Sequence, residues 1–148
     1  MSLDLSAPQS DTPLQGIKVL ELASVLAGPL VGTFLAELGA SVVKVEHPKG
    51  GDVTRTWRSE RESNEGPSAY YAAANGPKRI LQLDLLSEQG QAALERELTD
   101  TDILLQNFKT SSLSKLGVDP KALALRHPRL IHLHLKGFMD APERGGYD

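Results

Sequence analysis

Basic side chains flank several predicted strands, and their chemistry suits the binding of phosphate groups. Lysine and arginine hold phosphate through charge-assisted hydrogen bonds, and cations gathered at one sheet edge create a local positive field. Phe108 and Trp57 would add a flat surface for a purine. Taken singly, each residue is more simply explained as a solvated charge or a core aromatic side chain. The expected phosphate-binding rim consists of His47, Lys49, Lys78, Arg79, Lys115 and Lys136.

Five apolar stretches that could position these residues alternate with helix-forming stretches. The expected strands cover residues 17–22, 41–46, 79–84, 102–108 and 130–135. The expected helices begin near Pro29, Ser68, Ser87 and Asp119, and serine and aspartate are preferred N-cap residues. Such alternation favours a parallel sheet with right-handed crossovers. The predicted fold class is therefore α/β, a Rossmann-like parallel sheet with helices on both faces.

Residues 17–52 have the layout of a ligand site: a strand, a Gly-Pro turn, a short helix, a second strand and a basic, glycine-rich loop. A helix can begin with Pro29, and the free N–H groups of its first turn would face an anion. Ligands of such sheets lie at the carboxyl ends of the strands. Glu46 ends the second strand where a dinucleotide site would need an acidic residue, but residues 27–32, AGPLVG, do not match the G-x-G-x-x-G pattern.

Composition limits the classes of protein to which the chain can belong. Its 148 residues, 40% hydrophobic and 24% charged, are typical of one globular domain, which we place at residues 14–148 after a flexible leader at 1–13. A net charge of −3 argues against nucleic-acid binding. No apolar run approaches the roughly 18–20 residues of a membrane span, and the first dozen residues lack the basic start and the apolar core of a secretory signal. The absence of cysteine is compatible with a cytoplasmic protein.

Two further groups of polar residues suggest weaker alternatives. His132 and His134 are two residues apart on a predicted strand and share one face, with His127 nearby, which is one arrangement that binds a metal ion. Strand histidines that face solvent or a helix are the more ordinary case, and we expect no metal. Glu21 and Glu46 end adjacent predicted strands, where capping and solvation explain them more simply than paired catalytic carboxylates.

The sequence resembles the family III CoA-transferases, which include formyl-CoA transferase, carnitine CoA-transferase and, by fold, α-methylacyl-CoA racemase. The resemblance covers residues 14–148 and rests on five segments: residues 14–55, NGPKRILQLDL at 75–85, DILLQNFKTSSLSKLGVD at 102–119, HPRLIHLHLKGF at 127–138 and RGGYD at 144–148. It implies that the chain is the amino-terminal, CoA-binding half of a larger fold.

The resemblance also implies roles for individual residues. Leu26 and Ala27 would line the entrance near the thioester arm, and His47 stands where several members have a phosphate-binding arginine. Histidine lacks the charged fork of arginine, so Lys49 would have to supply that contact. Lys136 occurs in some transferases where many relatives have serine. The other residues that would approach coenzyme A or its nucleotide are Asn75, Lys78, Arg79, Asn107, Phe108 and Lys115.

The complete family protein would transfer CoA between an acyl-CoA thioester and a carboxylate. Its nucleophile is an aspartate that lies beyond the position matching Asp148, so we expect this chain to be inactive alone and nominate no catalytic residue within it. Alternatives are a racemase-type relative, a non-catalytic module that binds CoA or another adenine nucleotide, and a self-associating structural fragment. Because the family forms interlocked dimers, we expect a homodimer or larger oligomer.

Overall fold

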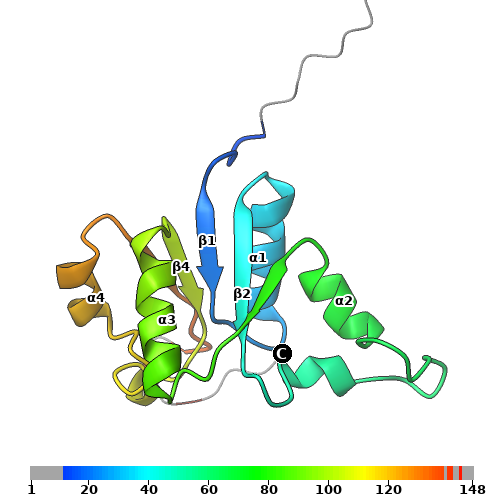
Figure 1. Ribbon diagram of the computed structural model, residues 1–148. Coiled ribbons are helices and arrows are strands. Elements are labelled where there is room, and N and C mark those ends of the chain that lie inside the picture. The colour runs from blue at the N-terminus through cyan, green and yellow to red at the C-terminus, as the bar shows by residue number, and fades with distance from the viewer. Residues whose placement is uncertain (1–11, 139, 142–143, 145–148) are drawn as a thin grey trace, which may run out of the picture.

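The computed structural model describes residues 12–138, 140–141 and 144, which contain a five-stranded parallel sheet (Figure 1). Its strands lie in the order β3-β2-β1-β4-β5, and all neighbouring strands run parallel. The chain starts in the middle of the sheet and completes first one half and then the other, as in doubly wound folds. The strands are β1 Lys18–Glu21, β2 Ser41–Glu46, β3 Arg79–Gln82, β4 Ile103–Gln106 and β5 Ile131–His134.

Short helices connect the strands, and three of the four α-helices begin at a side-chain cap. Ser68, Ser87 and Asp119 each accept a hydrogen bond from the backbone N–H three residues later, which satisfies a donor of the first helical turn. Leu26, at the N-cap of α1, makes no such bond. The α-helices are α1 Ala27–Glu37, α2 Ala69–Asn75, α3 Glu88–Thr99 and α4 Pro120–Arg126, and the 3-10 helices are η1 Val53–Thr56 and η2 Thr110–Ser112.

Apolar clusters occupy both faces of the sheet, because alternate strand residues point in opposite directions. Val19 of β1 belongs to the cluster on which α1 packs, whereas the adjacent Leu20 belongs to the cluster formed with α3 and α4. Helix α2 packs beside α1 (Figure 1). The helices therefore enclose the middle of the sheet, and the carboxyl ends of the strands share one edge.

The expected α/β fold with helices on both faces is confirmed. The second strand has its predicted bounds, and the other four are two or three residues shorter than predicted. The backbone N–H groups of Leu22, Leu83 and Leu135, just past three of these strands, still bond the neighbouring strand. Helix α1 starts two residues earlier than expected, which makes Pro29 its third residue. Proline is tolerated there because the first four N–H groups of a helix have no partner within it.

Several sequence expectations concern segments outside this framework. Residues 1–11 of the expected leader lie outside the described residues. The predicted basic, glycine-rich loop after the second strand is followed by η1. Within the described part of the chain, every helix is too short or too polar to cross a membrane.

Candidate functional site

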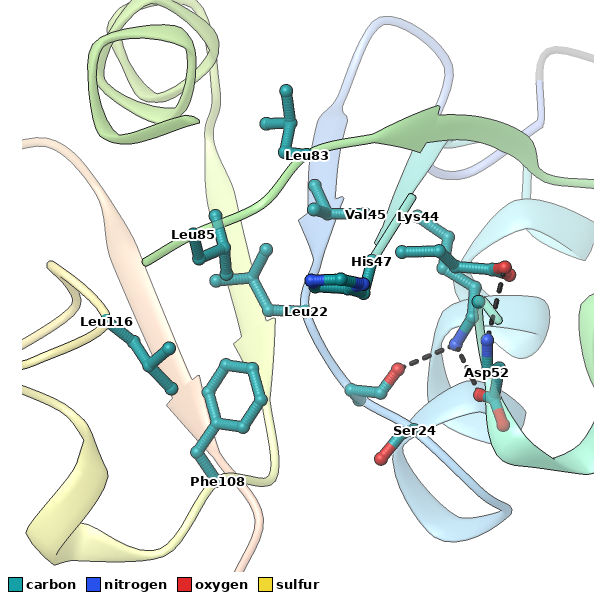
Figure 2. A pocket seen from close by; sticks show the side chains of 13 residues that line it. Leu22, Ser24, Lys44, Val45, His47, Asp52, Leu83, Leu85, Phe108 and Leu116 are labelled. Atoms are coloured by element: carbon teal, nitrogen blue, oxygen red, sulfur yellow. Dashed lines mark hydrogen bonds and ion pairs between the residues drawn. The ribbon is translucent and has the colours of Figure 1, made fainter. Parts of the chain in front are cut away.

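A pocket of about 220 Å³ opens at the carboxyl edge of the sheet (Figure 2). The segments that follow β1, β2, β3 and β4 all contribute to it, as expected for a ligand site in a parallel sheet. In Figure 2, Phe108 and Leu116 lie at the left, and Lys44 and Asp52 lie at the right. The lining residues are Leu22, Ala23, Ser24, Lys44, Val45, Glu46, His47, Gly51, Asp52, Leu83, Leu85, Phe108 and Leu116.

Two of the predicted ligand-binding residues, His47 and Phe108, line this pocket. The phenyl ring of Phe108 stands among leucines, so that side can take a flat or apolar group. The His47 side chain is half exposed, and its Nε2 lies 3.8 Å from Asp84 Oδ1. Its Nδ1 is 3.0 Å from the backbone nitrogen of Lys49, which orients the ring. His47 is thus placed to present Nε2 to a ligand at the mouth of the pocket.

The buried Lys44 joins the ends of β1 and β2 to the loop after β2. Its Nζ lies 3.0 Å from Glu21 Oε1 and 3.1 Å from Asp52 Oδ2, and it donates to the carbonyl oxygen of Ala23 at 2.6 Å. Only 1% of the side chain is exposed. A charge at that depth is tolerated only when it is paired and hydrogen-bonded. Lys44 therefore fixes three segments relative to one another.

The carboxylate of Glu21 also pairs with Lys78, and both side chains are 0% exposed. Lys78 Nζ lies 2.8 Å from Glu21 Oε2 and forms an ion pair without regular hydrogen-bond geometry. The same ammonium donates hydrogen bonds to the carbonyl oxygens of Pro29 and Ala74 and to Asn75 Oδ1. Burial raises the pKa of Glu21 and lowers the pKa of Lys78, despite the opposing charge of each partner. Each charge therefore depends on the other for its stability.

A second set of paired groups holds Glu46 at the end of β2. Arg55 Nε and Nη2 donate to the two carboxylate oxygens at 2.6 and 3.1 Å, and the Tyr71 hydroxyl donates to Oε1 at 2.6 Å. Burial alone would raise the pKa of Glu46, but the hydrogen bonds from Arg55 and Tyr71 outweigh it and lower the pKa. The two carboxylates in the lining, Glu46 and Asp52, are thus ionised and internally partnered, which suits a structural role better than proton transfer.

Two glycines allow α1 to lie directly on this buried charge cluster. A Cβ added at Gly28 would overlap the Cβ of Ala23, and one added at Gly32 would overlap Glu21 Oε2. The two glycines are four residues apart and therefore share one face of the helix. Their spacing in the sequence reflects close packing of helix on strand.

The remaining predicted site residues do not line the pocket. Asn107 follows β4, and its side chain bonds the backbone of Ser24. Asn75 is buried and donates to the Tyr71 carbonyl oxygen. Leu26 and Ala27 form the start of α1. Lys115, after η2, and Lys136, after β5, are exposed residues. They lie in the segments that follow the carboxyl ends of β4 and β5.

The structure corrects the geometry of the expected phosphate-binding rim. Lys78 precedes β3 and Arg79 begins it, so both lie at the amino end of that strand. The register pairs Arg79 with Val43 in the middle of β2. The Lys78 ammonium is buried under α1, and Arg79 is exposed. These two residues therefore do not join His47 at the pocket. Their assignment to nucleotide binding, which the family resemblance implies, stays a prediction.

Two other expectations concern aromatic and histidine side chains. Trp57 does not line the pocket and instead packs against Tyr70, with ring centroids 5.4 Å apart and the ring planes tilted by 59°. His132 and His134 share a face of β5 as predicted, with ring centroids 6.3 Å apart, and His134 Nε2 lies 2.8 Å from the Phe108 carbonyl oxygen. The described residues contain no cluster of three or more His, Cys, Asp or Glu side chains placed to hold a metal ion.

Sequence reasoning missed the residues that organise the site, notably Lys44, Asp52 and Gly32. A signal for Lys44 was present, because it interrupts an otherwise apolar strand that a parallel sheet buries on both faces. A lysine in such a strand indicates a buried ion pair. Asp52 carries no comparable signal, since aspartate after two glycines is usual in a surface loop.

Proteins of known name resemble this chain in sequence. The chain is 44% identical over 135 residues to the succinate–glutarate CoA-transferase of Agrobacterium fabrum, covering 88% of this chain and 34% of that protein. It is 36% identical over 127 residues to the formyl-CoA:oxalate CoA-transferase of Escherichia coli O6:H1, covering 86% and 30%. The chain thus spans about a third of the length of these relatives.

Solved structures of similar proteins superpose on this chain. A CAIB/BAIF family protein from Brucella suis superposes with a TM-score of 0.82 at 42% identity, covering 93% of this chain and 37% of that chain. A hypothetical protein from Mycobacterium tuberculosis superposes with a TM-score of 0.81 at 33% identity, covering 93% and 38%. The family described as CoA-transferase family III matches residues 14–148. This chain therefore belongs to CoA-transferase family III.

Proposed function

We propose that this chain forms the CoA-binding part of a CoA-transferase, and that the complete protein transfers CoA between an acyl-CoA thioester and a free carboxylic acid. Support comes from family membership and from the names of the relatives, which are CoA-transferases acting on carboxylic acids such as succinate, glutarate and oxalate. Acyl-CoA and a carboxylate are accordingly the proposed substrates of the complete protein. We further propose a cytoplasmic location, supported by a sequence without cysteine.

The observation that carries the proposal is the pocket at the carboxyl edge of the sheet, apolar on the side of Phe108 and polar on the side of His47. A coenzyme that combines a purine with phosphates needs both kinds of surface. The purine would lie against Phe108 and the surrounding leucines. The phosphates would reach the exposed basic residues on the strand-end segments, namely His47, Lys49, Lys115 and Lys136.

Replacement of Phe108 by alanine is expected to weaken CoA binding about tenfold, because stacking of a base on an aromatic ring contributes about 1–3 kcal/mol. Isothermal titration calorimetry with CoA measures the effect. Phe34→Ala is a matched control, since Phe34 is 60% exposed on α1 and does not line the pocket. Dephospho-CoA should bind more weakly than CoA, and added salt should weaken both. A wild-type chain that gives no heat at millimolar CoA would refute the proposal.

We also propose that the chain self-associates, as the family resemblance suggests. Ile131 and Leu133 of β5 are 62% and 39% exposed, and by their pairing with Ile103 and Leu105 they share the sheet face on which α1 packs. Multi-angle light scattering should give a mass that rises with concentration, and Ile131→Lys should lower it. Leu125→Lys, which changes an 86% exposed leucine of α4, serves as the control. A constant monomer mass over a wide concentration range would contradict self-association.

A further inference from the structure

The turn between β1 and α1 is held in an unfavourable backbone conformation. Val25 has a φ of 72°, which is a left-handed conformation that a β-branched residue rarely adopts. Such conformations persist only where surrounding structure imposes them, and they concentrate at functional sites. The turn borders the pocket through Ala23 and Ser24 and continues into Leu26 and Ala27 at the start of α1.

The three central residues of this turn, Ala23, Ser24 and Val25, are each bonded by a side chain from another part of the fold. Lys44 of β2 donates to the Ala23 carbonyl oxygen. Asp52, in the loop after β2, accepts from the Val25 N–H at 3.2 Å through Oδ2. Asn107, after β4, makes two bonds to one residue, since its Oδ1 accepts from the Ser24 N–H at 3.1 Å and its Nδ2 donates to the Ser24 carbonyl oxygen at 2.9 Å.

Asn107 differs from the other two residues that hold the turn. Lys44 and Asp52 also pair with each other, so a change in either disturbs the buried charges as well as the turn. Asn107 carries no charge, and both polar atoms of its side chain bond Ser24. Its amide reproduces the pairing that a neighbouring strand would offer, and it thereby fastens the turn to the end of β4. Asn107 is therefore the residue through which the turn can be tested separately from the charge cluster.

We propose that Asn107 is a positioning residue that keeps the strained turn in the shape that binds coenzyme A, instead of a residue that binds the coenzyme through its own amide. This inference rests on the proposed CoA-binding function. Without the two bonds from Asn107, Val25 would relax toward negative φ and carry Ala23 and Ser24 out of the pocket wall. The backbone N–H and carbonyl groups of the turn, and the side chains that follow it, would then lose their arrangement.

A double-mutant cycle between Asn107→Ala and Val25→Gly tests the proposal. Asn107→Ala should weaken CoA binding about tenfold, which is the scale set by strain at a non-glycine residue of positive φ. Glycine adopts positive φ without that strain, so in the Val25→Gly variant the turn should depend less on the hydrogen bonds from Asn107 to keep its shape. In the Val25→Gly background, Asn107→Ala should therefore weaken CoA binding by less than about threefold. Asn64→Ala, at an exposed asparagine, is the control for the amide deletion.

Hydrogen exchange provides a readout that does not involve the ligand. Asn107→Ala should speed exchange of the Ser24 and Val25 amides at least about tenfold, while the amides of β4 stay protected. Asn107→Asp keeps the acceptor for the Ser24 N–H and loses the donor to its carbonyl oxygen, so it should fall between wild type and Asn107→Ala. A normal circular dichroism spectrum and a cooperative melt establish that each variant is folded.

The outcomes separate the possible roles of Asn107. If Asn107→Ala cost the same CoA affinity in the wild-type chain and in the Val25→Gly variant, Asn107 would contact the ligand directly, and the proposal would be overturned. Unchanged exchange at Ser24 and Val25 in Asn107→Ala would overturn it as well. If the wild-type chain binds no CoA, the proposed function fails, whereas the exchange experiment still decides whether Asn107 holds the turn.

Discussion

Replacement of Lys78 by alanine is expected to lower the free energy of unfolding by about 3–5 kcal/mol, whereas Arg79→Ala should change it by less than about 0.5 kcal/mol. The two residues are adjacent and both basic, but their environments differ. The Lys78 ammonium is 0% exposed and neutralises Glu21, while Arg79 is exposed. Removal of Lys78 leaves the buried carboxylate with Lys44 as its remaining cation, and the carbonyl oxygens of Pro29 and Ala74 lose a donor.

Urea denaturation of the two variants and of the wild type measures this difference. The double variant Glu21→Gln/Lys78→Met should lose less stability than the sum of its single changes, because it removes both charges together. Burial moves the pKa of Glu21 upward and that of Lys78 downward even with the opposite charge beside each, so loss of either partner should destabilise the charge that remains. Equal stability of Lys78→Ala and Arg79→Ala would mean that the ion pair contributes nothing.

Periodic patterns in the sequence predict most of the framework. The alternation of apolar runs with capped helical segments indicates the parallel sheet, and Ser87 and Asp119 cap α3 and α4 as expected from their residue types. The edge of the sheet that carries the pocket follows from the same alternation, because the carboxyl ends of parallel strands meet there. This reasoning places His47 and Phe108 at that edge, where both line the pocket.

Long-range pairing within the site is not contained in such local patterns. Lys78 follows a Gly-Pro turn and precedes a strand, which is the usual setting of a solvated lysine. Its burial depends on where Glu21, more than fifty residues earlier, points once β1 lies in the middle of the sheet. Similarly, Asn107 has the appearance of a turn-capping residue, and only the folded chain brings it to Ser24. Side-chain pairings that depend on tertiary contacts were thus predicted less well than the helices and strands.

The glycines of α1 serve close packing, which is distinct from a dinucleotide fingerprint. Gly28 and Gly32 invite comparison with a dinucleotide fingerprint, which they do not match. Their spacing of four residues instead predicts one helix face without side chains, suited to close contact with another element. In the structure that face meets Ala23 and the buried carboxylate of Glu21.

Gly32→Ala is therefore expected to destabilise the fold by about 2–4 kcal/mol, although alanine favours helix over glycine by about 1 kcal/mol. The added Cβ would overlap Glu21 Oε2. That carboxylate has no free space to move into, because Lys44 and Lys78 hold its two oxygens and its side chain is fully buried. The overlap must therefore either push α1 away from β1 or break an ion pair, and each cost exceeds the gain in helix propensity.

Gly76→Ala provides the matched comparison, since Gly76 at the end of α2 is helical, exposed and has 3.4 Å between its would-be Cβ and the Ala72 carbonyl oxygen. That change should alter the free energy of unfolding by less than about 1 kcal/mol. Thermal and urea denaturation of both variants measure the contrast. If Gly32→Ala were as stable as Gly76→Ala, α1 would have room above Glu21, and the close packing of helix on charge cluster would not be a constraint on the site.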